Sequence, residues 1–156
     1  IWVDSNEFPL PIEGNNFGSA VDLAIVNNTE YIVGLVGDTP ALAKPAIWIN
    51  RELSFLPFPD GFDNPEVTAV SFDENGNYYV VGFAQDENNR NNSFIWKNGI
   101  FSFLSNTRSL VYDITIFEDD VYAVGSINSQ PVVWKNGSPT YLAGGGIARS
   151  IFIVEK

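Results

Sequence analysis

Four positions of the sequence carry a small polar residue in a similar context, and two of these residues are carboxylates that could do acid/base chemistry. The residues are Asp22, Ser71, Asp113 and Ser150, each followed by an apolar residue. If each lies on the innermost strand of an internal repeat, the four side chains line a central channel. Two carboxylates there could act as acid and nucleophile on a glycosidic bond, or hold a hard cation. The alternative is structural: each side chain bonds a backbone group or contacts the inner strand of the next repeat.

A second group of acidic residues lies in two connections that the sequence predicts to be loops. These candidate ligand-binding residues are Asp60, Asp63, Glu66, Asp86 and Glu87. Carboxylate oxygens are the ligands that calcium prefers, and a divalent cation would relieve the repulsion among converging carboxylates. The prediction is nevertheless no bound metal and no cofactor, because a solvated acidic surface explains the same residues. Calcium at these loops is the alternative.

The residue types that most often carry catalysis are missing from the chain. It contains no cysteine and no histidine, which removes the thiol nucleophile and the commonest base at neutral pH. The sequence also lacks the serine elbow of hydrolases and the glycine-rich phosphate loop. An enzyme would have to use carboxylates, such as Asp22 and Asp113 in a glycoside hydrolase or lyase. A binding function is therefore favoured over an enzyme.

Charge and hydropathy limit the class of partner. The chain has 19 acidic and 8 basic residues and a net charge of -11, which repels nucleic-acid phosphates and anionic membrane surfaces. No apolar segment reaches the roughly 20 residues that a membrane span requires. We expect neither nucleic-acid binding nor direct membrane insertion. A protein or a glycan is the partner class that this composition leaves open.

Two residue columns repeat along the chain and predict its architecture. The first is a tryptophan followed eight positions later by a leucine, and it contains Trp2, Trp48, Trp96 and Trp134. The second reads Tyr-x-x-Gly and contains Tyr31, Tyr79 and Tyr122. One large apolar residue per repeat is what packing between neighbouring repeats requires. We therefore expect the tryptophans to be buried filler; an aromatic platform for a sugar is the alternative.

The segments between these columns predict strands. Each repeat contains about four short apolar or alternating segments separated by turn residues, and Asn98-Gly99 and Asn136-Gly137 are strong hairpin signals. We expect a single all-β domain over residues 1–156, a β-propeller of about four blades with four antiparallel strands in each blade. The repeats cover roughly residues 1–34, 35–82, 83–125 and 126–156.

The two ends of the chain predict how the ring closes. Residues 1–10 match the outer two strands of a repeat, and residues 148–154 match an inner strand. These two segments would form a closing blade shared between the N- and C-termini. A four-bladed ring is small, and the alternative is a larger ring formed by two chains, which predicts a homodimer.

The predicted connections differ in length. Those between the first and second strands and between the third and fourth strands are tight, whereas the others are mostly longer and vary between repeats. In a propeller the long connections share one face. Loops that vary on a constant scaffold usually carry recognition, so a ligand is expected on that face.

The repeats resemble a family of bacterial propeller repeats that read Y-x-V-G, then V/I-W-K-N-G-x-x-x-x-L and A-x-S-I-x-I. Residues 96–99, 134–137 and 148–153 carry the resemblance, while the copies around Trp2 and Trp48 lack the Lys-Asn-Gly turn. Such repeats are frequent in secreted proteins and lipoproteins. The resemblance implies a propeller fold and an extracellular, periplasmic or cell-surface location, and it transfers no catalytic residue. The expected function is a non-enzymatic exported binding or scaffold module; a structural repeat of a larger surface protein is an alternative.

Overall fold

The computed structural model describes residues 2–3, 6–7 and 9–154 and has all-β architecture. Three four-stranded antiparallel sheets follow one another along the chain, and each is a meander in sequence order. The first sheet contains β3 (Phe17–Val26), β4 (Thr29–Gly37), β5 (Lys44–Ile49) and β6 (Glu52–Phe55). The second contains β7 (Phe62–Phe72), β8 (Tyr78–Asp86), β9 (Asn91–Lys97) and β10 (Ile100–Phe103). The third contains β11 (Ser109–Phe117), β12 (Asp120–Ile127), β13 (Gln130–Lys135) and β14 (Ser138–Tyr141).

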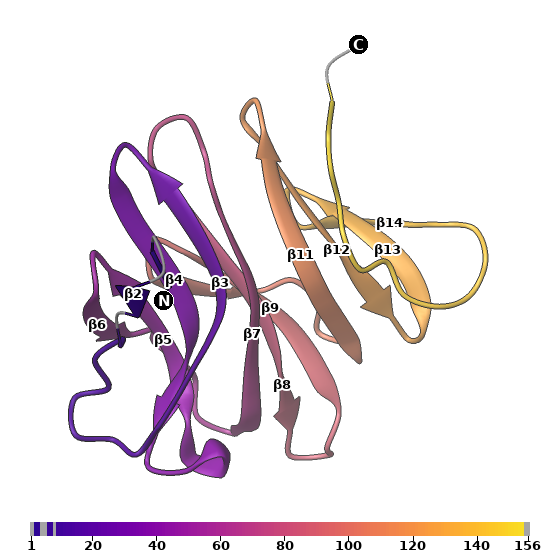
Figure 1. Ribbon diagram of the computed structural model, residues 1–156. Helices are drawn as coiled ribbons and strands as arrows, with labels where there is room; N and C mark the ends of the chain where they lie inside the picture. Colours follow the sequence, from indigo (N-terminus) through magenta and orange to yellow (C-terminus); the bar gives the residue numbers. More distant parts are fainter. Residues whose placement is uncertain (1, 4–5, 8, 155–156) are drawn as a thin grey trace.

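The three sheets stand face to face as an arc, and their inner strands β3, β7 and β11 lie side by side (Figure 1). A two-stranded pair, β1 (Trp2–Val3) and β2 (Asn6–Glu7), precedes the first sheet. The helical structure in the described ranges is one 3-10 turn, η1 (Pro40–Leu42), and no helix there is long and apolar enough to cross a membrane. The prediction of an all-β chain with four strands per repeat is confirmed for these three sheets.

The turn between the third and fourth strands of each sheet explains the repeated asparagine. In the second sheet both turn residues, Asn98 and Gly99, have positive φ, the geometry that two-residue hairpins prefer. The Asn98 backbone N–H donates to the Tyr78 carbonyl at 3.0 Å, and its Oδ1 accepts the Tyr78 N–H at 3.0 Å. The same pair of hydrogen bonds joins Asn50 to Glu30 and Asn136 to Val121. The asparagine therefore extends the pairing between the second and third strands of each sheet by one residue.

The glycine of the Tyr-x-x-Gly column is required by a close approach of two strands. β7 has an irregular register between Val67 and Ala69, opposite Gly82. A Cβ on Gly82 would lie 2.1 Å from the Glu66 carbonyl oxygen, which is well inside van der Waals contact. The equivalent glycines of the other sheets are Gly34 and Gly125, which meet backbone carbonyls at 1.8 Å. Each sheet thus has a β-bulge on its inner strand that presses on a glycine of the second strand.

Trp96 and Trp134 belong to the cores between neighbouring sheets, and Trp48 to a core that the first sheet forms with Leu10 and Ile12. Trp48, Trp96 and Trp134 are at most 1% exposed, so the prediction of buried filler is confirmed for these three. The indole N–H of Trp96 donates to the Pro57 carbonyl at 2.6 Å, and that of Trp48 donates to the Pro11 carbonyl at 2.7 Å. Each acceptor directly follows the last leucine of the preceding repeat. The side chain of Trp2 lies outside the described residues.

The expected closing blade is not formed by the described residues. Residues 148–154 belong to no strand, and the first two strands and this segment lie at opposite ends of the arc (Figure 1). The segment instead follows β11, held there by Asp113. Residues 1, 4, 5 and 8 of the expected N-terminal hairpin lie outside the described ranges. The coarse prediction of consecutive four-stranded units is correct, whereas ring closure within one chain is not observed.

Candidate functional site

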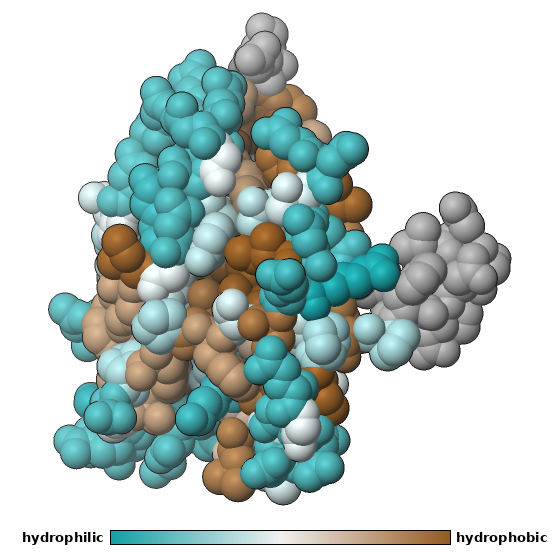
Figure 2. Space-filling model, turned by 90° about the vertical axis from the view of Figure 1, so that its left-hand side faces the viewer, coloured by the Kyte–Doolittle hydropathy of each residue, from teal (hydrophilic) through white to brown (hydrophobic). Residues whose placement is uncertain are grey.

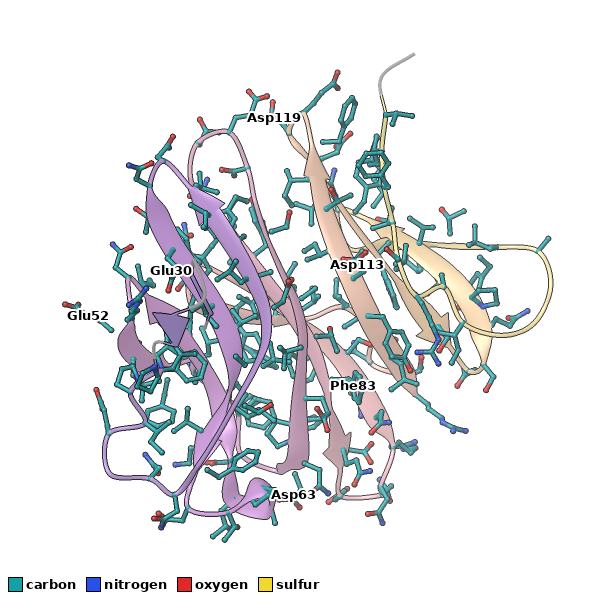
Figure 3. All side chains as sticks on the ribbon, viewed as in Figure 1. Glu30, Glu52, Asp63, Phe83, Asp113 and Asp119 are labelled. Carbon is teal, nitrogen blue, oxygen red and sulfur yellow. The ribbon has the colours of Figure 1, made fainter. Side chains whose placement is uncertain are left out.

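Three of the four expected channel residues contact a neighbouring strand or segment: Asp22 joins two inner strands, and Asp113 and Ser150 join β11 to the C-terminal segment. Asp22 accepts the Leu23 N–H with Oδ1 and the Val70 N–H of β7 with Oδ2, both at 2.9 Å. Asp113 lies between β11 and the C-terminal segment (Figure 3), where its Oδ2 accepts from the Ser150 hydroxyl and the Ile151 N–H at 2.9 Å. These bonds match the structural alternative, in which each carboxylate contacts the next inner strand.

The register places Ser71 outside this column, which corrects the sequence alignment. Asp22 pairs with Val33 and Asp113 with Val124, whereas the residue that pairs with the equivalent Val81 is Ala69. The β7–β8 turn, residues 73–77, is longer than the two-residue turns at the same place in the other sheets, so counting along the chain shifted the alignment to the polar Ser71. In the second sheet Thr68 makes the contact to the next inner strand instead, since its hydroxyl lies 3.2 Å from the carbonyl oxygens of both Val81 and Val111.

The five acidic candidates do not converge, and not all of them lie in loops: Asp63 and Glu66 are on β7, and Asp86 is the last residue of β8. Asp63 lies at the long-loop end of the arc, which carries the β4–β5 and β8–β9 connections, opposite the end marked by Asp119 (Figure 3). Asp86 forms a 2.9 Å ion pair with Arg90, which lies in the turn that follows it. The backbone N–H of Arg90 also bonds Asp86, and this is the main cause that lowers the pKa of the Asp86 carboxyl. The remaining carboxylates, of Asp60, Asp63, Glu66 and Glu87, are exposed to solvent.

No three acidic side chains in the described ranges are close enough together to hold a metal ion. We therefore expect the melting temperature to be the same in millimolar calcium and in chelator. A calcium ion at about 100 times its dissociation constant would instead stabilise the fold by about 2.7 kcal/mol. Differential scanning fluorimetry in the two buffers distinguishes these results, and a calcium-dependent rise that Asp63→Asn removes would contradict this expectation.

A cavity of about 360 Å³ lies between the second and third sheets. Its walls include Tyr79, Ile95 and Lys97 from the second sheet and Val121 and Trp134 from the third. The β13–β14 turn, at Asn136 and Gly137, also lines it. The cavity therefore opens at the end with the tight turns, away from the long-loop end where the sequence predicts a ligand.

The cavity exists because the third sheet presents smaller side chains than the second at equivalent positions. Between the first and second sheets, the Tyr78 ring packs 6.1 Å from that of Tyr31, and Phe101 joins the same core. By the register and the tryptophan column, Tyr78 corresponds to Val121 and Phe101 to Pro139. Val80 is likewise replaced by Ala123. The backbone spacing is set by the repeat, so the lost side-chain volume remains as space.

Trp134 differs from the other buried tryptophans in its hydrogen bonding. By the pattern of Trp48 and Trp96, its acceptor would be the carbonyl of Ser105, the residue after Leu104. The buried Trp134 Nε1 has no hydrogen-bond partner among the residues that the structure describes. A buried N–H without an acceptor costs about 1–3 kcal/mol, so the core around Trp134 lacks a stabilising bond that Trp48 and Trp96 make.

Lys97 adds a cation at the rim of the cavity. Its Nζ lies 5.0 Å from the centre of the Tyr79 ring, and a hydrogen bond with the Tyr79 hydroxyl is the main cause that raises the pKa of the lysine. The Tyr79 hydroxyl in turn donates to Asp73 Oδ2 at 3.1 Å. In the third sheet, the equivalent Lys135 forms an ion pair with Asp120 at 2.6 Å. Of these two lysines, Lys97 is the one that lines the cavity.

Sequence reasoning missed this site, although a signal for it exists in the columns. At aligned positions the second repeat has Tyr78 and Phe101, whereas the third has the smaller Val121 and Pro139, which indicates that the side chains of the third sheet fill less space. Comparison of the chain with protein-family models, with curated proteins and with solved structures found no match.

Proposed function

We propose that this chain is a non-enzymatic binding module of propeller-type repeats, and that its ligand is a small, mainly apolar molecule with one hydrogen-bond acceptor. The observation that carries the proposal is the cavity between the second and third sheets, which borders a buried tryptophan whose N–H lacks a partner. Ligand sites are typically apolar pockets of about 300–1,000 Å³ with few polar groups. The cavity has this size and this composition.

The chemistry of the walls specifies the ligand class. Tyr79, Ile95 and Trp134 provide apolar and aromatic surface for the body of a one- or two-ring molecule. Lys97 favours an anionic acceptor such as a carboxylate or sulfonate at the rim. The net charge of -11 opposes anions at long range, but at physiological salt this field is screened over about 8 Å.

The carboxylates give less support to a hydrolase. Asp22 and Asp113 each accept a backbone N–H from a neighbouring strand or segment, and this bond occupies an oxygen that a general acid would need. They also lie on β3 and β11, with β7 between them. The exported location and the propeller closure are parts of the proposal that rest on the sequence resemblance.

A second candidate site is the long-loop end between the first and second sheets. Two hollows of about 540 and 500 Å³ share Lys44 and Phe55. Asp60 and Asp63 border the larger of them, and Leu42, which is 65% exposed, borders the smaller. A protein or glycan partner on this surface is the alternative function, and it uses a different set of residues.

The cavity proposal can be tested with 1-anilinonaphthalene-8-sulfonate, whose rings and sulfonate match the walls and Lys97. We expect saturable binding with one site per chain, detected by dye fluorescence and by energy transfer from tryptophan. Val121→Tyr recreates the Tyr31–Tyr78 contact and fills the cavity, so it should weaken binding at least about tenfold, or 1.4 kcal/mol. Lys97→Gln removes an exposed charge and should weaken binding about two- to fivefold.

The matched control is Lys135→Gln, which removes the equivalent lysine of the third sheet without touching the cavity. It should bind the dye as the wild type does. Circular dichroism and a melting curve establish that each variant is folded. Wild-type affinity in Val121→Tyr would show that the dye binds elsewhere and would contradict the proposal.

A further inference from the structure

The first sheet exposes an apolar face of its inner strand. On β3, Leu23 is 45% exposed and Ile25 is 64% exposed. The register equivalents of Leu23 are covered, since Val70 on β7 is 7% exposed and Ile114 on β11 is 5% exposed. This end of the arc, viewed in Figure 2, shows apolar side chains gathered between polar borders.

The two internal interfaces show what covers this type of face. Val70 belongs to the core between the first and second sheets, where Ala24 of β3 packs and Asp22 bonds the Val70 N–H. Ile114 belongs to the next core, together with Ala69 of β7. In both cases the cover is the inner strand of the preceding repeat. The described residues that precede β3 supply the pair β1–β2 but no such inner strand.

The C-terminal end of the arc carries a segment that matches this missing inner strand. Ile151 donates its N–H to Asp113 in the same way that Val70 donates to Asp22, so residues 148–154 occupy the position of an inner strand. Exposure alternates along this segment: Ile151 and Ile153 are half-buried, while Phe152 is 87% exposed and Val154 is 66% exposed. The exposed side corresponds to the side by which β3 contacts β7.

We propose that residues 148–154 of one copy of this chain dock, through Phe152 and Val154, on the exposed β3 face of a second copy. The site is preshaped, because a hollow of about 420 Å³ lies there between Leu10, Leu23 and Ile32. Beside it, Pro11 accepts the Trp48 indole N–H as Pro57 accepts that of Trp96. The N-terminal segment of the second copy thus already lies where the outer strands of a preceding repeat would be. The docked segment takes the place of the inner strand of that repeat.

This interface is head-to-tail, because it joins two different surfaces of the same chain. It does not depend on the cavity or on its ligand. Both copies carry a net charge of -11, so association is expected to strengthen when salt screens their repulsion.

Sedimentation velocity over a range of protein concentrations, at low and at about 0.5 M sodium chloride, tests the proposal. We expect concentration-dependent association of the wild type. Leu23→Glu and Phe152→Glu should each weaken it at least about tenfold, and because both residues are exposed, both variants should fold. Mixing the two variants should restore a dimer, since one copy retains an intact C-terminal segment and the other an intact β3 face.

The control is Leu42→Glu, which changes an equally exposed leucine at the long-loop end and should associate as the wild type does. A wild type that stays monomeric under all conditions would overturn the proposal. So would a mixture of Leu23→Glu and Phe152→Glu that remains monomeric, because a symmetric interface or an unrelated partner predicts that result. Loss of association in Leu42→Glu would place the interface elsewhere.

Discussion

Replacing Trp96 by alanine is expected to lower the free energy of unfolding by about 3–5 kcal/mol, the range for a large aromatic residue in a packed core. Trp96 is fully buried. Its ring lies 4.6 Å from that of Phe94 and 5.7 Å from that of Phe101. These rings all lie on the second sheet, and Trp96 shares its core with Val33 and Ile47 of the first sheet. Two packed sheets cannot close the space left by the indole, so most of the cavity would remain. Urea unfolding followed by circular dichroism measures the loss.

The phenylalanine variants separate packing from hydrogen bonding. Trp96→Phe removes the donor to the Pro57 carbonyl and should cost about 1–3 kcal/mol more than packing alone. Trp134→Phe removes an N–H that has no acceptor among the described residues, so it should cost less. An alanine variant of Trp96 with unchanged stability would mean that the tryptophan is a surface platform and would reverse the interpretation of the repeat.

Gly125→Ala is expected to destabilise the fold by at least about 3 kcal/mol, the upper end of overpacking costs. A Cβ at this position would lie 1.8 Å from the carbonyl oxygen of Leu110 and 2.9 Å from the Cα of Val111. Both are backbone atoms of the bulged strand β11, so the clash cannot be relieved by a side-chain rotation. The bulge itself would have to shift, and with it the strand that carries Asp113.

Gly145→Ala is the matched control, because no atom lies within 4 Å of a Cβ at Gly145. That variant should have the stability of the wild type in the same urea experiment. If Gly125→Ala unfolds at the same urea concentration as Gly145→Ala, the close approach of β11 and β12 is not a requirement of the fold.

The strands, the tight turns and the buried tryptophans could be predicted because each depends on residues close together in sequence. An asparagine at a two-residue turn, as at Asn98-Gly99, specifies a hairpin locally. The recurring Trp and Tyr-x-x-Gly columns then indicate that one packed unit is repeated. These features hold in three sheets with nearly the same bonds.

The column of polar residues could be predicted only in part. Asp22, Asp113 and Ser150 do take part in contacts between inner strands, but the alignment chose Ser71 where the register has Ala69. The bulges have the same register in all three inner strands, but the β7–β8 turn spans residues 73–77, whereas the equivalent turns are residues 27–28 and 118–119. Which residues pair across the longer turn is decided by the strand register, which is not visible in a pattern of residue types. The partners of the acidic residues also depend on tertiary structure, since Asp86 ends β8 and forms an ion pair with Arg90 in the next turn.

The sequence alone determined the kind of element, the number of strands per repeat and the residues that fill the space between sheets. Only the tertiary structure decided the cavity beside Trp134 and the open ends at Leu23 and Phe152. A strand or a hairpin is specified by neighbours along the chain. A cavity remains where the side chains of two sheets are too small to fill the space that the repeat sets between them. An open end remains where the arc of sheets does not return to its start. Both features depend on residues far apart in sequence, so no single motif encodes them.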